Sequence, residues 1–326
     1  MLTPEEASPV PALGADGLTK LFRAHRGRFV HAVEDFSIEL VHGQVVALVG
    51  ESGCGKSTVA RLLAGITQPT KGSIYLNGDP VHIASAGQLR AYCHRVQMIF
   101  QDPFGSLNSI HTVRYILGRA VAIHHPGLRR AERDEKIAGL LEQVKLTPAS
   151  TFIDKFPHEL SGGQRQRVSI ARALAAEPQV LLADEPISML DVSMRLGILN
   201  LLQELRDDLG LAVLYITHDV ASARYFADHT VVMYAGRIVE RGPSEGVTQQ
   251  PAHPYTQLLV ASAPDPDHMA DVGSGSYGEP PSLINPPPGC RFAPRCPLAR
   301  DRCRDRQPTL ASVGPDHEVA CWEVAA

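Results

Sequence analysis

One stretch of this chain decides its fold: Gly50-Glu51-Ser52-Gly53-Cys54-Gly55-Lys56-Ser57. Two glycines separated by four residues and followed by Lys and Ser have the spacing of a phosphate-binding loop between a strand and a helix. The glycines let backbone N–H groups wrap phosphate oxygens, Lys56 reaches the β- and γ-phosphates, and Ser57 supplies a hydroxyl to Mg²⁺. A helix predicted from Thr58 onward directs its positive end at the anion. The motif predicts an α/β nucleotide-binding fold and leaves many NTPase classes open.

A second glycine-rich stretch, Leu160-Ser161-Gly162-Gly163-Gln164, opens a predicted helix over residues 164–176. A serine and two glycines at a helix N-terminus form another phosphate-binding site. An ordinary turn could contain the same glycines, but the neighbouring motifs favour phosphate. One γ-phosphate is not expected to need two such sites from one chain.

Polar residues follow three apolar runs that read as buried strands. The run at 180–184 ends in Asp184-Glu185, which predicts carboxylates at the carboxyl edge of a parallel sheet. His218 follows the run at 212–216, and Gln101 follows the run at 96–100. A solvated acidic loop and an isolated surface histidine are the alternatives, and the order of the motifs argues against both.

This ordered set resembles the ATP-binding cassette (ABC) family. The resemblance implies a P-loop NTPase domain with a helical subdomain, and two subunits paired head to tail, so that each signature helix caps ATP on the other. It implies that Glu185 polarises the attacking water, that His218 contacts the γ-phosphate, and that Gln101 touches both the water and Mg²⁺. Mg²⁺ would be held by Ser57, Gln101 and Asp184. The implied nucleotide-binding residues are Phe22, Gly50, Ser52, Gly53, Cys54, Gly55, Lys56, Ser57, Thr58, Ser161, Gly162, Gly163, Gln164 and Asp191.

Two of these assignments have features of their own. Phe22 matches the aromatic residue that stacks on adenine, although Phe is also common in protein cores. Asp191 ends Ser188-Met189-Leu190-Asp191, the loop that crosses the dimer interface near the catalytic water. The family usually has Ala at the position of Met189, so the longer side chain puts the packing of that interface in doubt.

Composition sets the limits of the whole chain. Its 326 residues, 44% of them apolar, suffice for one large domain and an appendage. A net charge of −4 gives no basic footprint for nucleic acid. No apolar run approaches the roughly 18 residues of a membrane-spanning helix, and residues 1–17 lack the pattern of a secretion signal. We therefore expect the protein to stay in the cytoplasm, and the resemblance implies that it lies at the cytoplasmic face of the inner membrane, bound there through partners.

The motifs divide the chain into three parts. Residues 1–17 are expected to form a flexible tail, residues 18–245 the nucleotide-binding domain, and residues 246–326 a C-terminal extension with a linker at 264–288. The helical subdomain should span about 102–163 and include a helix over 130–144, and a hairpin is predicted over 230–240. Each nucleotide motif occurs once, so a second cassette, identical or related, is required.

Four of the six cysteines lie in the extension, at positions 290, 296, 303 and 321. A segment this poor in apolar residues needs something other than a core to hold it together. A reducing cytoplasm disfavours disulfides, and structural zinc usually shows a pair separated by two to four residues, which is missing here. A [4Fe–4S] cluster uses four thiolates with varied spacing, so we favour a cluster on Cys290, Cys296, Cys303 and Cys321, with zinc or free thiols as alternatives.

The extension narrows the resemblance to the ATP-binding subunits of dipeptide and oligopeptide importers. The similar stretches are residues 289–297, His253-Pro254-Tyr255-Thr256 and residues 101–108. The resemblance implies two membrane permeases and an extracytoplasmic peptide-binding protein as partners. Some relatives carry nickel, glutathione or oligosaccharides instead. The alternatives from other classes are a soluble ABC ATPase without a transporter, a redox or iron sensor, and an exporter.

Overall fold

The computed structural model describes residues 10–262 and 281–324, and within them the main sheet has eight strands. Five of these strands run parallel, and three antiparallel strands extend one edge. In spatial order they are β6 (Val96–Ile99), β7 (Val180–Asp184), β8 (Ala212–Thr217), β3 (Val45–Val49), β9 (His229–Tyr234), β10 (Arg237–Pro243), β12 (His317–Val319) and β11 (Ala311–Gly314). The predicted hairpin at 230–240 is confirmed as β9 and β10.

The parallel strands are buried on both faces, which explains their continuous apolar sequences. Side chains of β3 alternate between two cores, with Val45, Ala47 and Val49 on one face and Val46 and Leu48 on the other. The first face is covered by α7 (Gly162–Leu174), α8 (Val192–Leu209) and α9 (Val220–Phe226). The second face is covered by α1 (Lys56–Leu63) and a smaller antiparallel sheet.

The smaller sheet has four strands among the described residues, in the order β2 (Phe29–Leu40), β1 (Leu13–Arg23), β4 (Lys71–Leu76) and β5 (Asp79–Pro80). β1 begins at Leu13, so the predicted tail of residues 1–17 is wrong in its last part. Ala12, Leu13 and Ala15 are buried in the core that the smaller sheet shares with α1, which fixes this segment as a strand. Residues 1–9 of the predicted tail lie outside the described residues.

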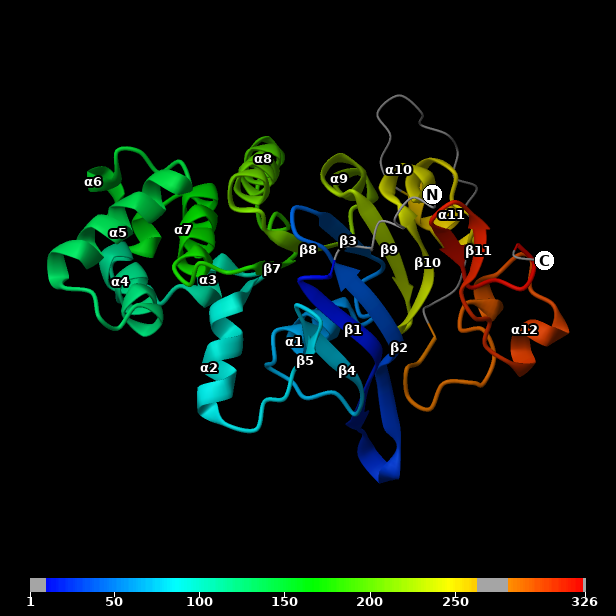
Figure 1. Ribbon diagram of the computed structural model, residues 1–326. Coiled ribbons are helices and arrows are strands. Elements are labelled where there is room, and N and C mark those ends of the chain that lie inside the picture. The colour runs from blue at the N-terminus through cyan, green and yellow to red at the C-terminus, as the bar shows by residue number, and fades with distance from the viewer. Residues whose placement is uncertain (1–9, 263–280, 325–326) are drawn as a thin grey trace, which may run out of the picture.

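A helical lobe follows β6 and projects from the sheet (Figure 1). It contains α3 (Pro103–Ser106), α4 (Val113–His124), α5 (Arg130–Gln143), α6 (Ala149–Phe152) and the signature helix α7, and α2 (Ala86–Arg95) precedes β6. The predicted helix over 130–144 is therefore confirmed as α5. Arg114 of α4 forms ion pairs with Asp134 and Asp154, which tie the helices of the lobe together.

The C-terminal extension is attached to the nucleotide-binding domain along several edges. It comprises α10 (Ser244–Gln249), α11 (Pro254–Ala261), a 3₁₀ turn at Ala293–Arg295, α12 (Asp301–Asp305), β11 and β12. Two further 3₁₀ turns, at His25–Gly27 and Pro157–Glu159, lie outside the extension. β12 pairs with β10 through Glu240 opposite Val319, so the extension lengthens the main sheet (Figure 1). Of the predicted linker at 264–288, residues 264–280 lie outside the described residues, whereas Ile284 bridges to Val30 of β2.

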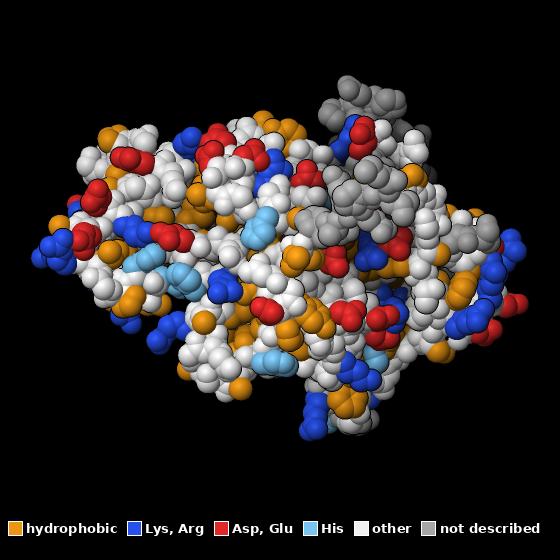
Figure 2. Space-filling model, viewed as in Figure 1, with side chains coloured by type: hydrophobic (Ala, Val, Ile, Leu, Met, Phe, Trp, Pro, Cys, Tyr) orange, Lys and Arg blue, Asp and Glu red, His pale blue; other side chains and the backbone are white. Residues whose placement is uncertain are grey.

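Charge and hydropathy agree with this layout. Acidic and basic side chains are interspersed over the face shown in Figure 2, both on the helical lobe and around α12. No helix in the described part of the chain combines the length and the apolar character needed to span a membrane.

Candidate active site

The phosphate loop joins the end of β3 to the start of α1, and two of its glycines are sterically required. A Cβ on Gly50 would lie 2.2 Å from the carbonyl oxygen of Met233, and one on Gly55 would lie 2.3 Å from that of Ala32. Gly55 also has a φ of 112°, which residues with a side chain rarely adopt. The loop is therefore packed against the backbone of neighbouring strands.

Lys56 and Ser57 begin α1, where both side chains are tied to the site. Lys56 Nζ donates to the carbonyl oxygens of Gly50 at 2.6 Å and Glu51 at 2.9 Å. Ser57 Oγ donates to Asp184 Oδ1 at 3.2 Å, and burial raises the pKa of the Asp184 carboxyl. A hydroxyl and a carboxylate are oxygen ligands of the kind that Mg²⁺ takes, so the side-chain oxygens of Ser57 and Asp184 fit this ion.

Gln101, Glu185 and His218 meet at one point. Gln101 Nε2 donates to Glu185 Oε2 at 2.9 Å, and His218 Nδ1 lies 3.2 Å from Glu185 Oε1. The three residues follow β6, β7 and β8, which are adjacent parallel strands whose carboxyl ends share one edge of the sheet. Glu185 has a φ of 46°, a left-handed backbone that is uncommon outside glycine and typical of strained functional positions. The arrangement places a carboxylate between an amide and an imidazole beside Asp184.

The signature stretch, Leu160-Ser161-Gly162-Gly163-Gln164, caps the N-terminus of α7. Ser161 Oγ accepts a hydrogen bond from the Gln164 N–H, and the Ser161 N–H donates to Gln164 Oε1 at 3.0 Å, which completes a capping box. A Cβ on Gly163 would lie 3.0 Å from Met194 Sδ, so this glycine keeps the start of the helix close to α8. Gly162 begins the helix itself. The stretch lies in the helical lobe, whereas α1 lies beneath the smaller sheet (Figure 1), so the chain does not bring its two phosphate-binding elements together.

The residue predicted to stack on adenine, Phe22, lies in β1. Phe22 is 42% exposed, lies opposite Val30 of β2, and has Lys20 Nζ 5.2 Å from its ring centroid. An exposed aromatic ring can stack on a base, which a buried core residue could not do. The remaining predicted loop residues lie as the motif requires, with Ser52 and Gly53 exposed, Thr58 half-buried in α1 and Cys54 buried. Burial raises the pKa of the Cys54 thiol.

The loop after Glu185 leads to a partly apolar surface. Ser188 Oγ donates to the Glu185 carbonyl oxygen at 3.0 Å, and Asp191 precedes α8. Met189 and Val192 are 55% and 80% exposed. Two exposed apolar side chains in the loop that follows Glu185 fit the predicted role of this loop at an interface between subunits.

The four cysteines of the extension carry free thiols. Burial raises the pKa of Cys290, and the charges of Cys303 and Cys321 raise it further. Burial also raises the pKa of Cys296 to about 11. Across residues 10–262 and 281–324, however, no group of three or more His, Cys, Asp or Glu side chains is arranged to hold a metal ion. The thiols are neighbours without forming a metal centre in this arrangement.

Two residues near the phosphate loop were not predicted. The Tyr255 hydroxyl accepts a hydrogen bond from the Glu51 N–H at 2.9 Å, and Arg295 forms an ion pair with the Glu51 carboxylate at 3.1 Å. The sequence contained one signal, an acidic residue within a loop that binds anions. Nothing in the spacing of residues more than 200 positions apart could identify its partners.

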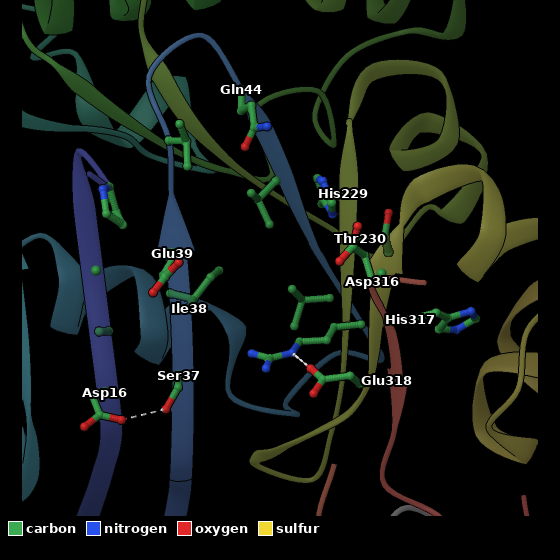
Figure 3. Close-up of a pocket in the computed structure, with 18 of the residues that line it drawn as sticks. Asp16, Ser37, Ile38, Glu39, Gln44, His229, Thr230, Asp316, His317 and Glu318 are labelled. Atoms are coloured by element: carbon green, nitrogen blue, oxygen red, sulfur yellow. Dashed lines mark hydrogen bonds and ion pairs between the residues drawn. The ribbon is translucent and has the colours of Figure 1, made fainter. Parts of the chain in front are cut away.

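A groove of about 900 Å³ lies away from this chemistry, between the edge of the smaller sheet and the added strand β12 (Figure 3). Asp16 and Glu39 line one side, and Glu318, paired with Arg241, lines the other. None of the predicted site residues lines it, so it is not the nucleotide site.

Two family models match the chain, one in the nucleotide-binding domain and one mainly in the C-terminal extension. A family model described as "ABC transporter" matches residues 33–188. A second, described as "Oligopeptide/dipeptide transporter, C-terminal region", matches residues 239–303. The second match spans β10, α10, α11 and the first three cysteines of the extension.

Relatives match over nearly the whole chain. The dipeptide transport ATP-binding protein DppF of Haemophilus influenzae is 40% identical over 99% of this chain and 100% of its own length. The probable peptide ABC transporter ATP-binding protein y4tS of Sinorhizobium fredii is 43% identical over 95% of this chain and 89% of its own. The putative oligopeptide transport ATP-binding protein YkfD of Bacillus subtilis is 42% identical over 96% of this chain and 95% of its own.

Solved structures share the fold. CbiO1 from Clostridium perfringens, described as part of the ABC transporter complex cbiONQ, aligns with a TM-score of 0.65 and 29% identity, over 74% of this chain and 91% of its own. A dimeric structure of the bacterial ABC transporter cassette MJ0796 aligns with a TM-score of 0.64 and 26% identity, over 71% of this chain and 98% of its own.

Proposed function

Because this chain belongs to the ABC transporter ATP-binding family, we propose that it is the ATP-hydrolysing subunit that energises import of dipeptides or oligopeptides through membrane permeases. The observation that carries the hydrolytic part is the convergence of Gln101, Glu185 and His218 beside the Ser57–Asp184 pair. The match of the extension to an oligopeptide/dipeptide transporter region, and the names of the relatives, support peptides as the cargo.

Nucleotide binding would use the two ends of the site. The backbone N–H groups of the phosphate loop and Lys56 would hold the phosphates, and Phe22 would stack on the adenine. Ser57, Asp184 and Gln101 would hold Mg²⁺, which neutralises charge on the phosphates. Lys56 Nζ uses two of its three N–H donors on carbonyl oxygens of the loop, and the third would bind phosphate oxygens, which are stronger acceptors.

Hydrolysis would proceed on the Glu185 side. Glu185 Oε2 or Oε1 would take the proton of a water aligned with the γ-phosphorus, and His218 would contact the γ-phosphate. Gln101 donates a hydrogen bond to Glu185, so it would orient the same water. Because the helical lobe begins just after Gln101, a shift of Gln101 on ATP binding or hydrolysis would move that lobe.

A second cassette would complete the site. Ser161 and Gly163 lie in the helical lobe and not at the phosphate loop, so they would bind the γ-phosphate held by a partner subunit. Closure would depend on ATP, because only the triphosphate gives both subunits a group to bind. Met189 and Val192 would lie at this interface. The further partners would be two permeases and an extracytoplasmic peptide-binding protein, with the subunit held at the cytoplasmic face of the inner membrane.

ATP turnover in the assembled transporter tests the proposal. The chain would be purified with its permeases in a membrane mimic, and hydrolysis measured with and without peptide-loaded binding protein. Stimulation by peptide supports the proposal. If nickel, glutathione or an oligosaccharide stimulates hydrolysis instead, that solute and not peptide is the cargo. If the permeases do not change the rate of hydrolysis, the chain is better explained as a soluble ATPase.

For the extension, we propose a [4Fe–4S] cluster on Cys290, Cys296, Cys303 and Cys321, with zinc as the alternative. Four thiolates are the ligand set of such a cluster, and the Cys290 N–H donates to the Cys303 carbonyl oxygen at 2.7 Å, which brings two of the four residues together. Anaerobic purification with iron, sulfide and zinc analysis tests it, and about four irons per chain are expected. Cys296→Ser should lose the iron and Cys93→Ser, outside the set, should keep it. A wild-type protein with neither metal would contradict both forms of the proposal.

A further inference from the structure

Two residues of the C-terminal extension hold the residue that follows Gly50 in the phosphate loop. The Glu51 N–H donates to the Tyr255 hydroxyl at 2.9 Å. Nη1 of Arg295 lies 3.2 Å and 3.1 Å from the two carboxylate oxygens of Glu51. The Tyr255 side chain is fully buried and that of Arg295 nearly so. Both the main chain and the side chain of Glu51 are therefore fixed from outside the loop.

The third polar group of Glu51 faces the catalytic lysine. Its carbonyl oxygen accepts hydrogen bonds from Lys56 Nζ at 2.9 Å and from the Cys54 N–H at 3.3 Å. Since the amide, carboxylate and carbonyl belong to one residue, a shift of Glu51 moves the oxygen on which Lys56 lies. Glu51 thus links the extension to the lysine that receives the phosphates.

Arg295 is itself held in a fixed orientation. Its Nη1 lies 3.3 Å from the Tyr234 hydroxyl, and its guanidinium carbon lies 5.8 Å from the Tyr234 ring centroid and 5.9 Å from that of Phe292. A planar guanidinium can stack on aromatic rings and meet a carboxylate at the same time, which an ammonium group cannot do in the same way. Arg295 therefore connects the aromatic side chains of Tyr234 and Phe292 to Glu51 of the phosphate loop.

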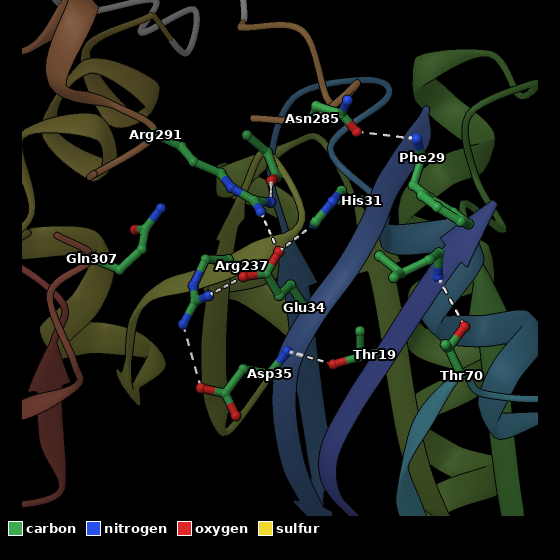
Figure 4. Close-up of polar contacts among 12 residues, drawn as sticks. Thr19, Phe29, His31, Glu34, Asp35, Thr70, Arg237, Asn285, Arg291 and Gln307 are labelled. Atoms are coloured by element: carbon green, nitrogen blue, oxygen red, sulfur yellow. Dashed lines mark hydrogen bonds and ion pairs between the residues drawn. The ribbon is translucent and has the colours of Figure 1, made fainter. Parts of the chain in front are cut away.

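A second arginine of the extension fixes the wall behind the loop. Arg291 donates to the Ala235 carbonyl oxygen and forms an ion pair with Glu34 of β2 at 2.5 Å (Figure 4). The same stretch of β2 carries Ala32, whose carbonyl oxygen lies against Gly55. In Figure 4, Asn285 reaches the backbone of Phe29 in the same strand. The extension therefore contacts both the loop and the strand that supports it.

We propose that Tyr255 and Arg295 are positioning residues for ATP binding, which hold Glu51, and through it Lys56, in the conformation that receives the phosphates. The inference rests on the proposed ATP-binding function and adds that the extension, far from the loop in sequence, is part of the nucleotide site. Its contribution is to the affinity for ATP, because neither residue reaches the carboxylate that activates water.

Arg295→Gln and Tyr255→Phe test this in the full-length chain assembled with its transport partners. Arg295→Gln removes the ion pair, and Tyr255→Phe keeps the ring while removing the acceptor of the Glu51 N–H. Each should raise the Kd for a fluorescent ATP analogue and the KM for ATP about threefold to tenfold, as expected for loss of a hydrogen bond to a partly buried polar group. The kcat should change less than about twofold, because the interaction is the same in ground and transition states.

Three controls separate positioning from general destabilisation. Arg295→Lys keeps the charge and should restore part of the affinity. Arg300→Gln removes an exposed arginine of the same extension, paired with Glu323, and should leave the Kd unchanged. Glu51→Gln combined with Arg295→Gln should be no worse than the weaker-binding single variant, because coupled residues do not act additively. All binding is measured well below the melting temperature of every variant.

The outcomes are distinct. Unchanged Kd in both Arg295→Gln and Tyr255→Phe, fully additive effects with Glu51→Gln, or an equal loss in Arg300→Gln would each overturn the inference. A fall in kcat with unchanged KM would also overturn it. If the wild-type protein itself does not bind ATP, or Lys56→Ala binds it equally well, the proposed function fails instead.

Discussion

At the scale of single residues, Glu185 combines a left-handed backbone with a carboxylate held between Gln101 and His218. Replacement by Gln keeps the shape but removes the group that can accept a proton. We expect Glu185→Gln to lower kcat by about 10²- to 10⁴-fold, the range for loss of a general base, while ATP binding is kept. Single-turnover hydrolysis and nucleotide affinity measure the two effects. Glu142→Gln on exposed α5 is the matched control, and normal turnover by Glu185→Gln would remove Glu185 from this role.

His253 gives a residue-scale prediction about pH. Its Nδ1 accepts the Tyr255 N–H at 3.0 Å, which requires a neutral ring, and burial lowers its pKa to about 4 from 6.5. The unfolded chain binds this proton more readily, so the stabilisation is fully present above pH 6.5 and is lost as the pH falls toward 4. Between pH 7 and pH 5 this group should remove about 2 kcal/mol from the free energy of unfolding.

The control for this pH effect is His253→Asn, which keeps a helix-capping acceptor but does not titrate. Urea unfolding at pH 7 and pH 5 gives the change in the free energy of unfolding with pH for the wild type and for His253→Asn. If the wild type and His253→Asn lose equal stability on acidification, another group is responsible.

At the scale of elements, the cap of α7 can be tested apart from its role in catalysis. Ser161 and Gln164 satisfy each other's backbone N–H groups. Ser161→Ala removes the side-chain acceptor and should lower the free energy of unfolding by about 0.5–2 kcal/mol. Urea denaturation with an unchanged m-value checks this. Ser161→Asn, another good capping residue, should retain most of the stability but not the hydroxyl offered to a partner's phosphate. Equal stability of the Ala variant would show that the cap contributes little.

The same scale shows what could be predicted from sequence. The ends of β6, β7 and β8 were predicted because each apolar run is followed by a polar residue whose chemistry depends on that position, and the end of β3 because a phosphate loop follows a strand. The start of β1 was misplaced because residues 1–17 are rich in Pro, Ala and Glu and read as one tail, whereas burial of Leu13 in the folded chain makes the last part a strand. The pairing of β12 with β10 could not be predicted, because three short-strand residues carry no local signal of their partner.

At the scale of the whole molecule, the extension lies against both sheets. β12 extends the main sheet, Ile284 bridges to β2 of the smaller one, and Arg295 reaches the phosphate loop. The last two contacts join residues more than 200 positions apart and the first joins residues 79 apart, so the sequence alone suggested an appendage behind a linker. The attachment means that the stability of the extension and that of the nucleotide site should not be separable.

Phe292 provides the test of that coupling. Its ring is buried and lies 5.2 Å from the Tyr234 ring of β9 and 5.6 Å from the Tyr255 ring of α11, so it joins the extension to the nucleotide-binding domain through β9. Phe292→Ala should lower the free energy of unfolding by about 3–5 kcal/mol, because a large aromatic side chain leaves a cavity. Calorimetry should show one transition, shifted as a whole to lower temperature, since both parts share this cluster. Leu298→Ala, on an exposed part of the same extension, should change the stability by less than about 0.5 kcal/mol. Two separate transitions, with only the smaller one shifted in Phe292→Ala, would instead mean that the extension unfolds independently and that its contacts with the loop do not bear on the stability of the nucleotide site.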